Sequence, residues 1–118
     1  MSKYLEAVQK RRSIYAIGKN SPISDDEIID IIKNALLHSP TAYNSQANRA
    51  VLLMGEDHND FWDIVMETLR KIVPEKSFSK TEDKINSFKN GHGTVLIFED
   101  VSETKALIEQ IPLYKDTF

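Results

Sequence analysis

The stretch HSPTAYNSQANRAVLLMG, residues 38–55, places a helix end, a polar loop and a strand in succession. The residue before Pro40 is kept out of the helical region, so a preceding helix must end there. Residues 41–49 are polar and turn-prone, and a loop of that length in a compact domain is more often functional than idle. Ala50 to Met54 is an all-apolar run before a glycine, which predicts a strand buried on both faces.

The flanking segments predict helices and one further strand. The strongest signal is a capping box, Ser24 with Glu27, followed by apolar side chains at helical spacing as far as Leu36. The other expected elements are a helix over 4–12 with Ser2 as N-cap, a helix from about Asp60 to Pro74, a helix with a Ser79–Glu82 capping box and Gly91 as C-cap, a strand over 94–98 and a helix from Ser102 to about Gln110.

This order of elements indicates an α/β (α+β) fold in a single domain, residues 1–118. Two short strands of the buried type do not make a stable sheet alone, because three or more strands or extensive cover are needed. We therefore expect further strands, either in a carboxy-terminal part that is missing here or in a partner chain.

Composition excludes several classes of protein. At 118 residues the chain can bury roughly two-thirds of its unfolded surface, enough for a core of its own. The absence of cysteine excludes disulfides and zinc–thiolate sites. A net charge of −3 lacks the basic excess that nucleic-acid binding requires. The apolar runs are too short to cross a bilayer, and the amino terminus does not resemble a signal peptide, so we expect a cytoplasmic protein without membrane or nucleic-acid partners.

The histidines and glycines offer no obvious catalytic motif. His38, His58 and His92 are far apart and lack ligand spacing, so we expect surface or capping histidines and no metal site. The sequence Gly91-His92-Gly93 precedes a strand instead of following one, which is typical of a turn and not of a dinucleotide cradle.

Two polar clusters remain as candidate sites. Arg11-Arg12-Ser13 combines guanidinium groups with a hydroxyl and could hold a phosphate monoester, although two arginines at a helix C-terminus are equally ordinary. Residues 39–46 offer hydroxyls, amides and backbone donors, which would suit the edge of a polar heteroaromatic ligand. The alternative there is a solvated loop.

Taken together, these clusters resemble the nitroreductase flavoprotein family, and specifically its fatty-acid-repression-mutant-like branch. The family motifs are KRRSIY at 10–15 and SPTAYNSQ at 39–46. The branch character comes from YAIGKN at 15–20, WDIV at 62–65 and GTVLIFED at 93–100. The resemblance extends over essentially the whole chain.

The resemblance implies a fold and an activity. Members of the family have a mixed sheet flanked by helices and form intertwined homodimers with FMN at the interface. NAD(P)H reduces the flavin, which then reduces nitroaromatics, quinones or similar small molecules. By this resemblance residues 1–118 are the amino-terminal part of a fold of roughly 200 residues, at the upper end of the usual size for one domain.

The resemblance also implies binding residues, whereas it assigns no catalytic residue. Arg11 resembles the arginine that binds the FMN phosphate, and Arg12 and Ser13 resemble its neighbours at the phosphate and ribityl chain. Ser39, Pro40 and Thr41 resemble the backbone that lies against the isoalloxazine across the dimer, and Asn44 and Gln46 resemble residues that fix this loop and reach the flavin. A lysine or polar residue near the flavin pyrimidine corresponds to Lys84, Asn86 or Lys89, with Lys84 preferred.

A chain without cysteine or a metal motif has no redox group of its own, so redox chemistry would require a cofactor. The alternative reading is a truncated, non-catalytic module for partner binding or stress regulation that has lost the flavin. A yellow protein distinguishes the first reading from the second.

Overall fold

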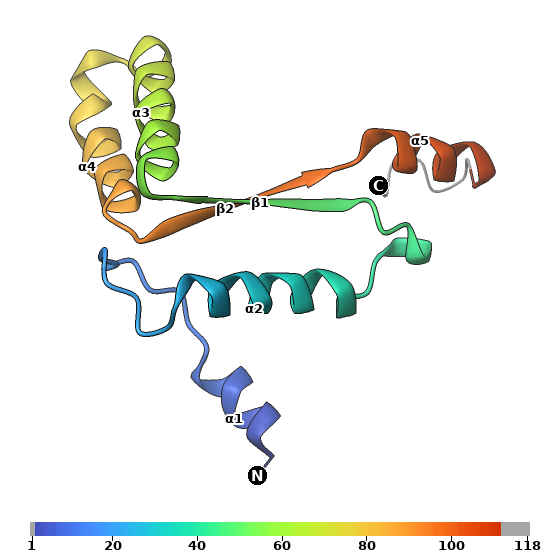
Figure 1. The fold of residues 1–118 in the computed structure, drawn as a ribbon. Coiled ribbons are helices and arrows are strands. Elements are labelled where there is room, and N and C mark those ends of the chain that lie inside the picture. The colour runs from blue at the N-terminus through green and yellow to red at the C-terminus, as the bar shows by residue number, and fades with distance from the viewer. Residues whose placement is uncertain (1, 112–118) are drawn as a thin grey trace.

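A computed structural model describes residues 2–111 as a mixed α/β structure with a two-stranded sheet (Figure 1). The described helices and strands follow in the order α1 (Lys3–Lys10), α2 (Asp25–His38), η1 (Ala42–Asn44), β1 (Asn48–Met54), α3 (Gly55–Ile72), η2 (Glu75–Ser77), α4 (Phe78–Lys89), β2 (Gly93–Glu99) and α5 (Val101–Gln110).

The two strands pair with each other in antiparallel register, from Asn48 opposite Glu99 to Met54 opposite Gly93. Side chains alternate between the faces of the pair. Ala50 and Ile97, which are register partners, share the face that lies against α2, where both line a cavity with residues of that helix. Helices α3 and α4 stand side by side at one end of the sheet, and α5 follows β2 at the other end (Figure 1).

The number of strands in the described part agrees with the prediction, whereas their burial does not. We expected strands buried on both faces, but Val51 is 43% exposed and Phe98 is 51% exposed. On the other face Ile97 is 70% exposed. Both faces are apolar, and the described elements cover them only in part. The apolar residues on both faces of the strands therefore predict further elements packed against the sheet, and residues 2–111 do not supply them.

Two predicted N-caps are confirmed. The Ser2 hydroxyl accepts a hydrogen bond from the Leu5 amide at 3.2 Å, and Ser24 accepts from the Glu27 amide at the same distance. Each bond satisfies one of the free amides at a helix start. Helix α1 ends at Lys10, however, and not at Arg12 as predicted.

Two other helix starts differ from the prediction. Helix α3 begins at Gly55, five residues before Asp60, because Gly55 adopts a φ of +58° and turns the chain directly from strand to helix. Helix α4 begins at Phe78 after a 3-10 turn, without a side-chain cap. Ser79 and Glu82 therefore lie inside the helix, and the predicted capping box is wrong. The C-cap of α4 is Asn90, one residue before the predicted Gly91.

The core of the described part is small. Its buried apolar side chains are Ala47, Phe78 and Ile85. The accessible surface is 9615 Å², whereas a compact monomer of this mass exposes about 6500 Å². The radius of gyration is 18.2 Å, against about 13.5 Å for a compact domain of this length. The expectation that 118 residues form a self-sufficient core is therefore wrong. No described helix combines the length and apolar character needed to span a bilayer.

Candidate functional site

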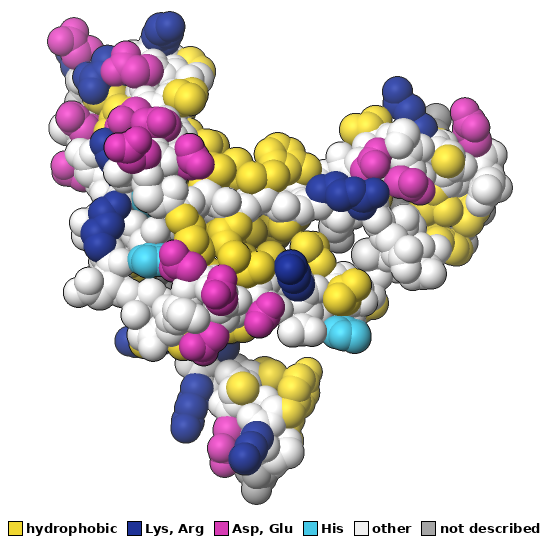
Figure 2. Space-filling view, viewed as in Figure 1, with side chains coloured by type: hydrophobic (Ala, Val, Ile, Leu, Met, Phe, Trp, Pro, Cys, Tyr) yellow, Lys and Arg dark blue, Asp and Glu magenta, His cyan; other side chains and the backbone are white. Residues whose placement is uncertain are grey.

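A cavity of about 580 Å³ lies between α2, the sheet and the polar loop that joins them. Its apolar wall comes from the helix and the strands, and apolar side chains are visible between these elements in Figure 2. Its polar end is formed by Ser39, Thr41, Asn44, Gln46 and Asn48. A long apolar wall with a few polar groups at one end suits an amphipathic ring system.

The backbone of the loop is held in an unusual conformation. Tyr43, Asn44 and Gln46 have φ values of 52°, 54° and 53°, in the left-handed region that side chains other than glycine and asparagine rarely adopt. Such residues cost of order 1–3 kcal/mol each and cluster at functional sites. The Gln46 amide donates to Thr41 Oγ1 at 3.2 Å, and Gln46 Nε2 donates to Asn44 Oδ1 at 3.2 Å. Hydrogen bonds within the loop therefore hold this backbone conformation, although most of the loop's residues are exposed.

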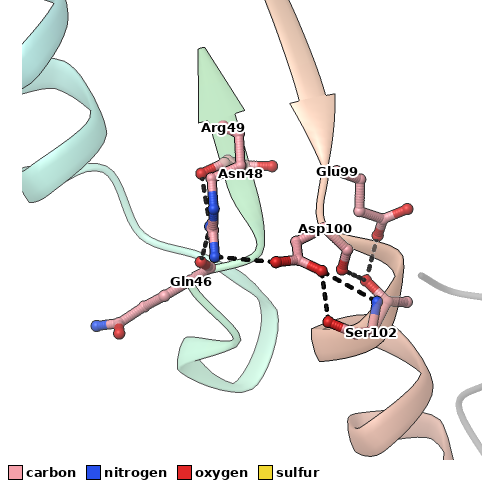
Figure 3. Close-up of polar contacts among 7 residues, drawn as sticks. Gln46, Asn48, Arg49, Glu99, Asp100 and Ser102 are labelled. Carbon is pink, nitrogen blue, oxygen red and sulfur yellow. Dashed lines mark hydrogen bonds and ion pairs between the residues drawn. The ribbon is translucent and has the colours of Figure 1, made fainter.

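Arg49 and Asp100 fasten this loop to the rest of the chain (Figure 3). Arg49 Nη1 donates to the Gln46 carbonyl at 2.7 Å, and Nη2 lies 3.2 Å from Asp100 Oδ2. The other carboxylate oxygen of Asp100 caps α5, accepting from the Ser102 hydroxyl at 2.6 Å and its amide at 3.1 Å. These bonds from Ser102, with Arg49 nearby, hold the pKa of Asp100 below its usual range.

Arg11, Arg12 and Ser13 follow α1 in an exposed segment. The backbone at Arg11 is extended, with φ −62° and ψ 130°. Within residues 2–111 no hydrogen bond or ion pair engages these three side chains, so five-donor guanidinium groups stand available for an anion. This donor set fits a phosphate monoester.

The structure brings together some of the predicted site residues and not others. Ser39, Thr41, Asn44 and Gln46 line one cavity, with Pro40 between two of them in the chain. Arg11, Arg12 and Ser13 do not line it, and Lys84 is exposed on α4. Lys89 is engaged by Asp63, with 2.6 Å between Nζ and Oδ1. A single chain therefore does not unite the two clusters.

The prediction of surface or capping histidines is wrong for His58, which is 1% exposed. His58 Nε2 lies 2.8 Å from the Lys89 carbonyl oxygen, and Nδ1 lies 2.7 Å from Thr94 Oγ1. Because a carbonyl only accepts, Nε2 carries the hydrogen, and in the neutral imidazole Nδ1 then accepts from the threonine hydroxyl. Thr94 in turn accepts from Trp62 Nε1 at 2.8 Å. This network joins α3 to β2 and to the end of α4. Among the described residues no group of histidine and acidic side chains could hold a metal ion.

The sequence of this chain was compared with those of known protein families. The sequence model of the nitroreductase family matches residues 8–113. The chain belongs to the nitroreductase family. It is 32% identical to the protein HBN1 of Saccharomyces cerevisiae over 120 residues, covering 100% of this chain and 59% of HBN1. It is 30% identical to nitroreductase FRM2 of the same yeast, covering 98% of this chain and 58% of FRM2. The predicted family and branch are thereby confirmed.

Solved structures of nitroreductases share the fold. Nitroreductase CinD from Lactococcus lactis in complex with chloramphenicol has a TM-score of 0.79 and 35% identity, covering 98% of this chain and 57% of CinD. A nitroreductase from Saccharomyces cerevisiae has a TM-score of 0.79 and 29% identity, covering 95% and 61%. CinD has also been solved in complex with 4-nitrophenol. The present chain thus spans less than two-thirds of the relatives it matches.

Proposed function

We propose that this nitroreductase chain contributes to an FMN-dependent oxidoreductase that uses NAD(P)H to reduce nitroaromatics, quinones or similar small acceptors. The observation that carries the proposal is the cavity whose polar end is the constrained loop of Ser39, Thr41, Asn44 and Gln46. CinD complexes with chloramphenicol and 4-nitrophenol support aromatic acceptors as the substrate class.

Arg11, Arg12 and Ser13 would hold the FMN phosphate and the adjoining ribityl chain. Their guanidinium and hydroxyl groups have no partners among the described residues, so binding an anion would not require breaking an existing ion pair. Charge-assisted contacts of this type are about twice as strong as neutral hydrogen bonds.

The loop would hold the ring. Ser39, Pro40 and Thr41 would supply backbone against the isoalloxazine, and Asn44 and Gln46 would supply amides. FMN, when bound, supplies the redox chemistry, because it accepts hydride from NAD(P)H and passes electrons to the acceptor. Lys84 would stabilise negative charge near the pyrimidine edge, since Lys89 is already paired with Asp63. Asn86 stays as the polar alternative.

The site would be completed by a homodimer. The two clusters are not united in one chain, and the accessible surface exceeds that of a compact monomer by roughly half. A second copy that brings its own loop to the Arg11 segment accounts for both observations. Residues 1–118 would then be the amino-terminal part of one larger domain with further strands, located in the cytoplasm, where proteins without cysteine pairs are usual.

One observation favours a second function. Exposed apolar side chains on both faces of the sheet, including Val51, Ile97 and Phe98, would suit a non-catalytic module that binds a partner or regulates a stress response. Such a module would bind no flavin.

Titration of the purified chain with FMN and with riboflavin separates these readings. The enzyme reading predicts quenched flavin fluorescence, a protein-bound flavin spectrum and weaker binding of riboflavin, which lacks the phosphate. Oxidation of NAD(P)H on addition of a nitroaromatic or quinone then tests turnover. If flavin fluorescence and absorption stay those of free FMN throughout the titration, the flavoenzyme reading is excluded and the binding module is supported.

A further inference from the structure

The loop of the candidate site ends at Gln46, whose backbone is in the left-handed region and whose carbonyl oxygen is bound by Arg49, a residue outside the loop. Gln46 has a φ of 53°, and its carbonyl oxygen accepts from Arg49 Nη1 at 2.7 Å. The same nitrogen donates to the Asn48 carbonyl at 3.0 Å. One guanidinium group therefore fixes the carbonyls of two residues, Gln46 and Asn48, on either side of Ala47, at the point where the loop becomes strand β1.

Asp100 orients that guanidinium group. Its Oδ2 lies 3.2 Å from Arg49 Nη2, and its own amide donates to the Ala47 carbonyl at 2.6 Å. Ala47 is buried, which makes this backbone bond a fixed reference between the loop and the start of α5. Arg49 and Asp100 thus meet from the first residues of β1 and the last residue before α5 (Figure 3).

We propose that Arg49 is a positioning residue of the candidate flavin site and that Asp100 holds it in place. This inference rests on the proposed function. Arg49 holds the Gln46 carbonyl, and so maintains the left-handed backbone of Gln46, whose residue lines the cavity together with Asn44. Arg49 does not line the cavity, and its hydrogen bonds go to Gln46, Asn48 and Asp100, so we assign it the role of positioning the loop.

Losing the Arg49–Asp100 pair would change the conformation of the loop more than the free energy of unfolding. The Arg49 and Asp100 side chains are 51% and 34% exposed, and ion pairs this accessible contribute little to folding. Their loss would leave the free energy of unfolding nearly unchanged. It would, however, release a strained segment whose conformation persists only while its surroundings hold it.

The test uses Arg49→Lys, which keeps the charge but cannot make the forked contact. Arg70→Lys is the matched control, because Arg70 lies over the Phe78 ring, 4.6 Å from its centroid, away from the cavity. We expect Arg49→Lys to raise the FMN dissociation constant by about threefold to tenfold and to change the visible circular dichroism of bound FMN. Arg70→Lys should leave both unchanged, and the urea midpoint of Arg49→Lys should match that of the wild type.

Asp100→Asn is the second variant, and it keeps an oxygen to cap α5. It should reproduce the effect of Arg49→Lys, and the double variant should be no weaker than either single one, because the two residues act together. Faster hydrogen exchange at the Gln46 amide, which donates to Thr41, is expected in each variant without flavin. A wild-type chain that takes up no FMN removes the proposed function and this inference with it. A wild type that binds FMN, beside variants with unchanged affinity, dichroism and exchange, overturns the inference alone.

Discussion

His92 and Asp25 are joined by a contact of 2.7 Å between Nε2 and Oδ1, and Nδ1 of His92 lies 2.7 Å from the Lys19 carbonyl oxygen. Both partners are acceptors, so both ring nitrogens donate only in the protonated imidazolium. The hydrogen bond to Asp25, followed by that to the Lys19 carbonyl, raises the pKa of His92 above 6.5. The charged groups around the ring are Asp25 at the start of α2 and Lys19, whose Nζ donates to the Lys89 and Gly91 carbonyls.

We predict that the contact between α2 and the start of β2 weakens as pH rises. A raised folded-state pKa means that the stabilisation is fully present below pH 6.5 and is lost as pH rises through the folded-state pKa of His92. The difference in free energy of unfolding between wild type and His92→Gln should therefore be largest in mildly acidic solution and shrink in alkaline solution. Urea denaturation across this pH range measures it.

The contact between His92 and Asp25 has a matched control, because Asp26 lies in the same first turn of α2. Asp25→Asn should lower the His92 pKa, as followed by NMR of the imidazole ring. Asp26→Asn removes the neighbouring carboxylate, which has no contact with His92, and should leave that pKa near the wild-type value. Equal effects of the two substitutions would contradict the assignment of Asp25 as the partner.

The Thr94 hydroxyl links the buried His58 to the half-buried Trp62, and its removal should destabilise the protein. In Thr94→Val, Trp62 loses its acceptor and His58 loses its donor, and leaving the buried His58 nitrogen unsatisfied costs about 1–3 kcal/mol. Thr68→Val is the control, since this exposed hydroxyl bonds only within its own helix. Urea denaturation measures both, and emission from Trp62, the single tryptophan of the sequence, should change only in Thr94→Val. Similar losses in the free energy of unfolding for the two variants would contradict the role assigned to the hydrogen bonds among Thr94, His58 and Trp62.

Local signals in the sequence were sufficient for most helices. Ser2 and Ser24 cap helices where predicted because capping depends on residues three positions apart. The start of α3 could not be predicted by periodicity, because it depends on the positive φ of Gly55. The burial of His58 was equally out of reach, since its partners Lys89 and Thr94 lie 31 and 36 residues away in the chain.

The polar residues of the candidate site could be predicted from the sequence, whereas the residues that hold its loop in place could not. The polar residues 39–46 could be singled out as a candidate functional loop, and the structure places several of them around one cavity. Arg49 and Asp100 were missed, because 51 residues separate them; Arg49 lies beyond the motif at 39–46, and the motif that ends at Asp100 indicated the family branch and no site residue. The available signals were an arginine directly before an apolar strand and an aspartate directly before a helix, and both are common in ordinary structures.

Gly93 provides a test of the strand pairing. A Cβ built on Gly93 would lie 2.9 Å from the Leu53 carbonyl oxygen, which is fixed in the neighbouring strand. Gly93→Ala should therefore destabilise the protein by about 1–3 kcal/mol, as overpacking does. Gly18→Ala is the control, because a Cβ there meets no atom within 4 Å and should be neutral or slightly stabilising. Thermal or urea unfolding compares the two, and a harmless Gly93→Ala would show that the register differs.

Arg11 provides the sharpest test of the phosphate site. Its side chain is exposed and makes no ion pair within residues 2–111, so its replacement by alanine should leave the free energy of unfolding nearly unchanged. FMN binding should weaken by about 1.5–3 kcal/mol, the usual worth of a hydrogen bond to a charged group. Riboflavin binding should change little, because it has no phosphate. Lys10→Ala, one position earlier, removes the same charge without the fork and should affect FMN far less. Equal losses for Arg11→Ala and Lys10→Ala would reduce the effect to general electrostatics, and equal losses for FMN and riboflavin would place Arg11 away from the phosphate.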